Sequence, residues 1–343
     1  MRDFPVLIDE VTPAWLSRAL GRTVKSFTAQ PVGTGQIGTC YRLALHGIGT
    51  PNRVIIKLPA ADPATRALLA GTYRVEVCFY RDIANTVNVR APACYHHDSA
   101  DDGDFVLLLE DLAPSRQGDQ LIGCSIAQAH DAVVNLAGLH GPRWCDPTLL
   151  RVEGLGLNGL ADAAALAEFY GPANEVFLDR VGGLLAPADR DTLREIPGVL
   201  EKWALGRAER FALVHGDYRV DNLLFSPNDG AAVHAVDWQT LSLALPARDL
   251  AYFVATSLEP AARRNNEQDL VGTYHRALGP DVTAGFTYEQ CWDDYRFAML
   301  QGPLISVFGL AYGKRTDRGD RMFAVMATRA CAAIRDLDSI ACV

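Results

Sequence analysis

The stretch FALVHGDYRVDNLLFSPNDGAAVHAVDWQ, residues 211–239, alternates short apolar runs with polar residues. Apolar residues flank the segment HGDYRVDN, residues 215–222, and a further apolar run after the Asn-Asp-Gly sequence at 228–230 ends at Asp237. Short apolar runs bounded by turn residues are typical of strands. The stretch therefore predicts carboxylate groups at strand ends.

Three polar residues of this stretch have the spacing that phosphoryl transfer from Mg-ATP requires. Asp217 could accept the proton of an acceptor hydroxyl group, Asn222 could bind one magnesium ion, and Asp237 could bridge magnesium to the β- and γ-phosphates. Magnesium prefers hard oxygen ligands and takes few of them from protein, so one amide and one carboxylate are a normal contribution. Any one of the three could merely cap a turn, but HGDxxxxN followed by a second strand-end aspartate favours a catalytic site.

A glycine pattern near the N-terminus is the second candidate site. The stretch PVGTGQIGTCYRLAL, residues 31–45, places Gly33, Gly35 and Gly38 in GxGxxG spacing. A dinucleotide-binding loop would open a helix, whereas the residues that follow Gly38 alternate in the manner of a strand. The pattern therefore favours a glycine hairpin over ATP phosphates, although a chance match or an ordinary turn also fits it.

A lysine and a glutamate lie in apolar surroundings further along the chain. Lys57 is part of RVIIKLP, and Glu76 shares one helical face with Phe79, Tyr80 and Ile83. A buried charge is costly unless it is paired, so each residue is a candidate partner for the other. A strand lysine held by a helix glutamate is part of a kinase site, while two separate solvated surface charges are the simpler alternative.

Composition limits the class of protein. The chain has 343 residues, of which 49% are hydrophobic, and its net charge is −9. No basic run is present, which disfavours nucleic acid and anionic membranes as partners. The N-terminal residues contain no apolar stretch of signal-peptide length, and no segment is long enough to span a bilayer, so we expect a cytoplasmic protein without membrane insertion. The eight cysteines form no CxxC pair, which favours reduced thiols in a core.

The order of predicted elements indicates two lobes. Strand-like runs interrupted by one helix occupy the N-terminal part of the chain, after a short helix capped by Thr12 and ended by Gly21. The chain turns mainly helical after Pro114, beginning with a helix that Ser125 and Gln128 cap. The segment EDLAPSRQGD, residues 110–119, marks the boundary. We therefore expect an N-terminal ATP-binding lobe, residues 1–112, and a C-terminal catalytic and acceptor-binding lobe, residues 113–343.

Together these motifs resemble the aminoglycoside phosphotransferase and choline-kinase-like superfamily, most closely its ecdysteroid-kinase-like branch. The resemblance rests on HGDYRVDN, VDWQ, ARDLAYF, EVCFY and LLLEDL, and it covers the chain from the glycine hairpin to about residue 280. It implies an α+β, two-lobed protein-kinase-like fold, with an antiparallel sheet and one key helix in the N-terminal lobe. It also implies ATP and Mg²⁺ as cofactors and a small-molecule hydroxyl group as acceptor.

The resemblance assigns a role to each matching residue. Asp217 corresponds to the catalytic base, Lys57 to the phosphate-binding lysine and Glu76 to its partner. Asn222 and Asp237 correspond to the metal ligands. The remaining assignments are a γ-phosphate contact for Arg219, a brace of the catalytic loop for Asp249, and adenine contacts for the backbone from Glu110 to Leu112. A solvated arginine also explains Arg219, and a charge in the first turn of a helix also explains Asp249.

The acceptor is the least determined part of the prediction. A polycationic aminoglycoside needs a dense acidic pocket, whereas residues 250–315 mix carboxylates with arginines and aromatic side chains. We therefore predict a hydroxyl group on a lipophilic or mixed-polarity metabolite. The alternatives are an aminoglycoside O-phosphotransferase and a nucleotide-binding pseudokinase scaffold; a hydrolase with paired carboxylates would leave Lys57 and Glu76 unexplained.

Overall fold

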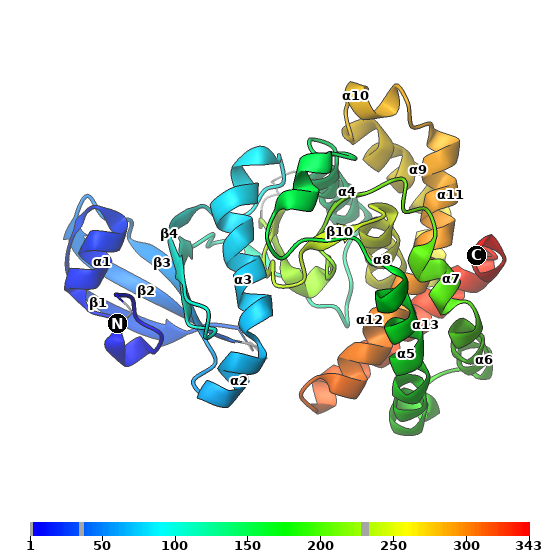
Figure 1. Ribbon diagram of the computed structural model, residues 1–343, viewed down its shortest axis with the longest axis horizontal. Coiled ribbons are helices and arrows are strands. Elements are labelled where there is room, and N and C mark those ends of the chain that lie inside the picture. The colour runs from blue at the N-terminus through cyan, green and yellow to red at the C-terminus, as the bar shows by residue number, and fades with distance from the viewer. Residues whose placement is uncertain (1–2, 34–37, 228–232) are drawn as a thin grey trace. The chain divides into compact units, whose positions relative to one another are not determined.

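The computed structural model describes residues 3–33, 38–227 and 233–343, and the chain divides into two compact units (Figure 1). The first unit consists of Met1–Thr86, Ala91–Pro114 and Val236–Leu241, and the second of Val87–Arg90, Ser115–Ala235 and Ser242–Val343. The predicted Asn-Asp-Gly turn at 228–230 lies outside the described residues, as does Gly35. The functional division at residue 112 stays a prediction.

The first unit is built on a five-stranded antiparallel sheet with the strand order β1-β2-β3-β5-β4. Its strands are β1 (Thr23–Pro31), β2 (Gly38–Ile48), β3 (Arg53–Pro59), β4 (Cys94–Ser99) and β5 (Phe105–Glu110). Its helices are α1 (Pro13–Leu20), α2 (Pro63–Leu68) and α3 (Ala70–Cys78), which continues as a π-helical turn over Phe79–Ile83. The strands predicted from the sequence are confirmed to within a few residues.

The predicted caps of the first helix are confirmed. The Thr12 side chain accepts a hydrogen bond from Trp15 N, Pro13 begins α1, and Gly21 ends it with a φ of +61°. The helix packs against β1 and β4 and covers one face of the sheet (Figure 1). That face carries a core cluster that includes Leu16 and Ile56.

Side-chain alternation along β3 decides where its lysine points. Val54, Ile56 and Leu58 belong to the core cluster under α1. Since successive side chains of a strand point to opposite faces, Lys57 faces the other side of the sheet. Helix α3 packs there, against β4 and β5 (Figure 1). The sheet therefore directs Lys57 toward the helix that carries Glu76.

The second unit is mainly helical. Its helices are α4 (Ile126–His140), α5 (Leu160–Val181), α6 (Pro187–Glu195), α7 (Leu200–Leu205), α8 (Ala247–Ser257), α9 (Pro260–Ala277), α10 (Pro280–Thr283), α11 (Tyr288–Phe297), α12 (Gln301–Tyr312) and α13 (Asp317–Asp336). Its short strands are β6 (Arg116–Gln117), β7 (Ala212–Val214), β8 (Leu223–Phe225), β9 (His234–Ala235) and β10 (Ser242–Ala244). They form a β10-β7 pair and a three-stranded β6-β8-β9 sheet. The predicted capping box of α4, formed by Ser125 and Gln128, is confirmed.

Helix α8 is the centre of this unit. Every residue from Ala247 to Ser257 is buried. Helices α11, α12 and α13 pack against it, and α12 also packs against α5 (Figure 1). Because α8 follows β10, the partner of β7, it lies beside the loop that leaves β7. Among the described residues, no helix combines the length and apolar character that crossing a bilayer requires.

Candidate active site

Lys57 is the centre of an ion-pair group in the first unit. Its Nζ lies 2.7 Å from Glu76 Oε2, 2.8 Å from Glu76 Oε1 and 3.0 Å from Asp237 Oδ1. Lys57 and Glu76 are both buried, whereas the Asp237 side chain is 42% exposed. The structure thus brings together three residues that are far apart in the sequence, and the predicted pairing of Lys57 with Glu76 is present.

The surroundings keep Lys57 charged. Burial alone would lower the pKa of Lys57, but attraction by Glu76 and Asp237 outweighs it, and the pKa is raised above its ordinary value of 10.5. An ammonium group that points from β3 toward the accessible Asp237 carboxylate is suited to bind phosphate oxygens.

The backbone and the neighbours of Asp237 hold its carboxylate in place. Asp237 has a φ of +69°, a conformation that few residues other than glycine adopt. The next residue, Trp238, is fully buried and stacks on Phe79 with ring centroids 3.6 Å apart and an interplanar angle of 7°. The segment Val236–Leu241 is therefore anchored to the helix that carries Glu76.

The predicted glycine loop is described only in part. Gly33 has a φ of +76°, and a Cβ at Gly38 would lie 2.8 Å from the Leu58 carbonyl oxygen of β3. Backbone geometry therefore requires glycine at both positions, independently of phosphate binding. Gly35 lies outside the described residues. The phosphate role of the three glycines stays a prediction.

The predicted adenine segment follows β5. Glu110 ends the strand, and its backbone N–H donates to the Ala93 carbonyl. The side chain of Asp111 accepts from Arg42 Nε at 2.8 Å and from the Ala113 backbone N–H at 3.1 Å. These bonds fix the backbone on both sides of Leu112. Asp111 is a positioning residue that sequence reasoning missed.

The loop after β7 is held from α8 and α4. Asp249 Oδ2 accepts from His215 N at 2.6 Å, and its Oδ1 accepts from Gly216 N at 3.0 Å. The His140 ring, fully buried, lies 3.4 Å from the same carboxylate and 2.7 Å from the Tyr274 hydroxyl group. Asp249 thus makes the contacts expected of a brace, and these bonds order the backbone immediately before Asp217.

The carboxylate of Asp217 receives three side-chain donors. Tyr252 Oη donates to Oδ1 at 2.8 Å, Asn222 Nδ2 donates to Oδ2 at 2.8 Å, and Arg219 Nε donates to Oδ2 at 3.1 Å. Asn222 Nδ2 also lies 2.9 Å from the Asp217 backbone carbonyl. Three of the predicted site residues, Asp217, Arg219 and Asn222, are therefore in direct contact in the second unit.

Arg219 is itself fixed by its neighbours. Burial would lower the pKa of Arg219, but Asp217 and Asp221 raise it, so the guanidinium group stays charged. Its Nη1 lies 3.0 Å from the Met322 sulfur atom of α13 and 3.6 Å from Asp221 Oδ2. The contact of Arg219 with a γ-phosphate stays a prediction, and the contact shown is with the proposed base.

Two residues around this loop have functions that the sequence did not indicate. The hydroxyl group of Tyr252 contacts Asp217, and no motif of the sequence specifies this contact. The Gln120 side-chain oxygen accepts from Val220 N at 2.8 Å, and the Gln120 backbone N–H donates to Asp221 Oδ1 at 2.8 Å. The only sequence signal for Tyr252 was its place in ARDLAYF, three residues after Asp249.

Asn222 of the second unit and Asp237 of the first unit each carry an oxygen atom that suits a hard cation. Asn222 uses its Nδ2 atom to hold Asp217, so Oδ1 is the side-chain atom with which it could bind a metal. Asp237 offers a carboxylate that is accessible to solvent. One amide oxygen and one carboxylate are ligands that magnesium accepts in proteins, so these residues fit that ion by chemistry.

Comparisons with known sequences agree with these motifs. A model of the ecdysteroid kinase-like family matches residues 200–283, which contain the catalytic loop, Asp237 and Asp249. A mouse protein described as acyl-CoA dehydrogenase family member 10 is 37% identical over 70 residues, which are 19% of this chain and 6% of the mouse protein. A chicken protein described as acyl-CoA dehydrogenase family member 11 is 34% identical over 64 residues, 17% of this chain and 8% of that protein. The matched segments are thus small parts of much longer relatives.

Solved structures share the fold over nearly the whole chain. A choline kinase from Cryptosporidium parvum has a TM-score of 0.61 at 10% identity and covers 96% of this chain and 94% of its own. A structure described as a putative aminoglycoside phosphotransferase from Ralstonia eutropha has a TM-score of 0.56 at 16% identity, with coverage of 94% and 97%. An ethanolamine kinase from Plasmodium vivax has a TM-score of 0.51 at 12% identity, with coverage of 91% and 84%.

The solved structures confirm the fold class predicted from the sequence, and the family match agrees with the predicted superfamily. The fold is the α+β, two-lobed protein-kinase-like fold, and the family match falls on the stretch that carries the catalytic motif. The chain therefore has the fold of these kinases, and its residues 200–283 match the ecdysteroid kinase-like family model.

Proposed function

We propose that this protein is an ATP- and Mg²⁺-dependent kinase that transfers the γ-phosphoryl group to a hydroxyl group of a small molecule. The observation that carries the proposal is the Asp217 carboxylate, held by Tyr252, Asn222 and Arg219 in a loop that Asp249 braces. The Asp217 side chain is 22% exposed, and a carboxylate that several donors orient while it stays partly exposed is what a base for a hydroxyl proton requires.

We propose the roles of the remaining residues from the family resemblance. Lys57, kept charged by Glu76, binds phosphate oxygens, and the backbone from Glu110 to Leu112 meets the adenine base. Asn222 and Asp237 hold magnesium, which neutralises the charge of the phosphates when it is bound. Gly33, Gly35 and Gly38 belong to the loop proposed to cover the phosphates.

In the proposed reaction Asp217 takes the proton of the acceptor hydroxyl group. The acceptor oxygen forms a bond to the γ-phosphorus while the bond to the β-γ bridging oxygen breaks, so ADP leaves and the phosphorylated alcohol remains. Arg219, beside Asp217, stabilises the carboxylate before the transfer and offers a positive charge to the transferred group.

The charges of the second unit support an acceptor other than an aminoglycoside. Four acidic residues within 250–315 are paired with arginines of the same unit: Glu259 with Arg329, Glu267 with Arg263, Asp293 with Arg207, and Asp294 with Arg210. Carboxylates already neutralised by arginine offer little to the ammonium groups of a polycation. We therefore propose a lipophilic or mixed-polarity alcohol as the acceptor.

A kinetic panel tests the acceptor class. ATP consumption is measured with kanamycin, with apolar alcohols including sterols, and with small polar alcohols. We expect turnover of the apolar alcohols and little or none of kanamycin. Efficient turnover of kanamycin alone would assign the protein to the aminoglycoside O-phosphotransferases instead.

The replacement Asp217→Ala tests the catalytic role and separates a kinase from a pseudokinase scaffold. We expect the rate of phosphoryl transfer to fall by about 10² to 10⁴, the usual contribution of a general base, while Mg-ATP still binds. The matched control is Asp281→Asn, an exposed aspartate of α10. Near-normal turnover of the Asp217 variant would refute the assignment, and a wild-type protein that binds Mg-ATP without any turnover would support the scaffold.

A further inference from the structure

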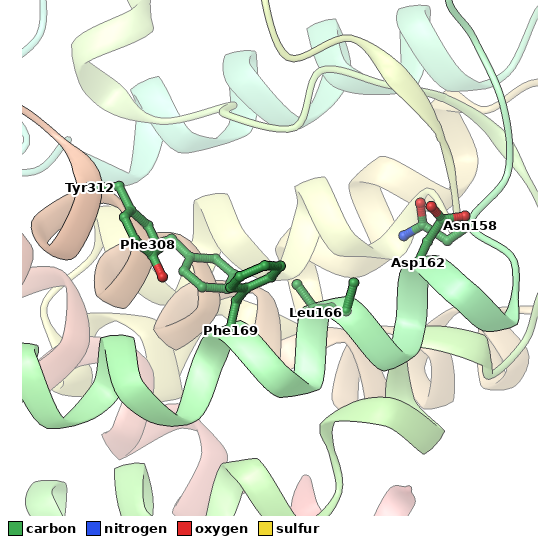
Figure 2. A pocket seen from close by; sticks show the side chains of 7 residues that line it. Asn158, Asp162, Leu166, Phe169, Phe308 and Tyr312 are labelled. Carbon is green, nitrogen blue, oxygen red and sulfur yellow. The ribbon is translucent and has the colours of Figure 1, made fainter.

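An open hollow lies between α5 and α12 in the second unit, and its volume is about 580 Å³. Six of the residues that line it are shown in Figure 2: Asn158, Asp162, Leu166, Phe169, Phe308 and Tyr312. Cavities of 300–1,000 Å³ are typical of small-molecule sites. The two helices are separated by more than a hundred residues of sequence, so only the fold creates this hollow.

The residues that line the hollow change from polar to aromatic along α5. Asp162, Leu166 and Phe169 follow the i, i+4, i+7 spacing of one helical face. Figure 2 shows Asn158 and Asp162 at one end, Leu166 in the middle, and the rings of Phe169, Phe308 and Tyr312 at the other end. At a rise of 1.5 Å per residue, this face is about 10 Å long between Asp162 and Phe169.

Two of the aromatic rings are accessible. Phe169 is 57% exposed and Tyr312 is 65% exposed, whereas most large apolar side chains of this unit are buried. Tyr312 packs against Phe308 with ring centroids 5.7 Å apart, and Phe308 in turn contacts the buried Tyr170. The aromatic side chains thus pack on buried residues and remain exposed to solvent, as a binding surface for an apolar group requires.

The charge of the hollow restricts its ligand. Among the described residues that line it, Asp162 is the only charged side chain, and one of its oxygen atoms accepts from the Gly159 backbone N–H at 2.8 Å. A carboxylate or phosphate ligand would meet no cation there, and a polycation would meet a single carboxylate. The chemistry that fits is an uncharged body with an apolar length of about 10 Å and a polar group at one end.

The hollow belongs to the same unit as the proposed base, and its helices are linked to it. Helix α12 packs against α8, which carries Tyr252. Helix α13 begins five residues after Tyr312, and there Arg318 Nη2 lies 3.1 Å from Asp221 Oδ1 while the Met322 sulfur atom accepts from Arg219. The end of α12 is therefore joined within a few residues to side chains that contact the catalytic loop.

We infer that the hollow between α5 and α12 is a binding site for an uncharged alcohol with an apolar body, and that this site is separate from Asp217. Phe169, Phe308 and Tyr312 hold the apolar end, and Asn158 and Asp162 hold a polar substituent.

The test uses 6-phenylhexan-1-ol and its charged analogue 6-phenylhexanoate as probes, with binding measured by calorimetry on the full chain. We expect the alcohol to bind and the carboxylate to bind at least tenfold more weakly, because Asp162 repels it. In Phe169→Gln/Tyr312→Gln the affinity for the alcohol should fall about tenfold, since two apolar contacts are lost. Val176→Gln, at an exposed apolar residue of α5 outside the lining, should leave it unchanged.

A second variant addresses the polar end. Asp162→Asn should narrow the difference in affinity between 6-phenylhexan-1-ol and 6-phenylhexanoate, because it removes the negative charge while keeping a polar side chain. Equal affinity for the alcohol in the wild type and the double variant would overturn the site, and so would equal affinity of the wild type for both probes.

Binding by Asp217→Ala separates this inference from the proposed function. The alcohol should bind this variant as it binds the wild type, because the hollow does not include Asp217. Binding that depends on Phe169 and Tyr312 would uphold the site, whether or not the wild type phosphorylates any alcohol of the kinetic panel. Phosphorylation of a small polar alcohol without binding of 6-phenylhexan-1-ol would refute the site and uphold the kinase.

Discussion

At the scale of single residues, the orientation of Asp217 depends on a hydroxyl group that lies 35 positions away in the sequence. Tyr252 Oη donates to Asp217 Oδ1 at 2.8 Å, and the ring is fully buried beside Met322 and Met326. Burial, together with the nearby Asp217 carboxylate, raises the pKa of Tyr252 well above 10, so it remains a neutral donor. Tyr252 is therefore a positioning residue for the proposed base.

Replacing Tyr252 by phenylalanine should slow the reaction without weakening nucleotide binding. We expect Tyr252→Phe to lower kcat about tenfold, the effect of losing one hydrogen bond to a charged group, with the KM for ATP unchanged. The acidic limb of the pH–rate profile should move to higher pH, because the charged carboxylate loses a donor. Both effects are measured by steady-state kinetics between pH 5 and 9.

The matched control is Tyr170→Phe. Tyr170 is equally buried, and among the described residues its hydroxyl group has no hydrogen-bond partner. The Tyr170→Phe variant should have the same pH–rate profile as the wild type. A fall in kcat for Tyr252→Phe with an unmoved acidic limb would assign Tyr252 a purely structural role.

At the scale of elements, the contact between β3 and α3 depends on a buried ion pair. Removing Lys57 alone leaves Glu76 as an unpaired buried charge, which costs about 3–5 kcal/mol of unfolding free energy. Replacing both partners by apolar residues of similar volume removes the buried charge altogether. We therefore expect Lys57→Met to be strongly destabilising and Lys57→Met/Glu76→Leu to recover most of the stability, as measured by urea denaturation.

Activity and pH distinguish this pair from a simple packing contact. Both variants should lack phosphoryl transfer, because neither has the Lys57 ammonium group that is proposed to bind phosphate. The double variant should therefore be stable and inactive. The pKa of Lys57 is raised above its unfolded value of 10.5, so the pair's stabilisation is complete below that pH and is lost only as pH rises through the higher folded value. The difference in unfolding free energy between the wild type and Lys57→Met should therefore be constant between about pH 7 and 10. A double variant no more stable than Lys57→Met would contradict the ion-pair account.

At the scale of the whole molecule, nucleotide binding should appear as thermal stabilisation. A ligand present at about 100 times its Kd stabilises the native state by about 2.7 kcal/mol, which corresponds to a rise in Tm of a few degrees. We expect this rise with ATP and magnesium together, and a smaller one with ATP and a chelator.

Asp237→Asn should remove the magnesium-dependent part of that rise. The amide keeps the shape and can still accept from Lys57, but it lacks the negative charge that magnesium requires. Asp281→Asn is again the control. If the wild type and the Asp237 variant show the same shift with and without magnesium, the metal ligand must be another residue.

The sequence by itself determined the local elements and the chemistry of the candidate site. Thr12, Pro13 and Gly21 predicted the first helix, and Ser125 with Gln128 predicted the start of α4, because capping depends on residues within one turn. Likewise HGDYRVDN lies within eight residues, so its spacing alone indicates which side chains share a loop. The predicted strands depend on alternation that is visible along each segment.

The tertiary structure alone decided which distant residues meet. The contact of Asp237 with Lys57 spans 180 positions, and the hydroxyl group of Tyr252 reaches Asp217 because α8 packs beside β7. The arginines that neutralise Glu259 and Asp294, 70 and 84 positions away, also come from distant segments. Local patterns carry no information about such pairs, since they depend on how sheets and helices pack. The hollow between α5 and α12 exists for the same reason, because its aromatic side chains come from two helices that only the packing of the unit brings together.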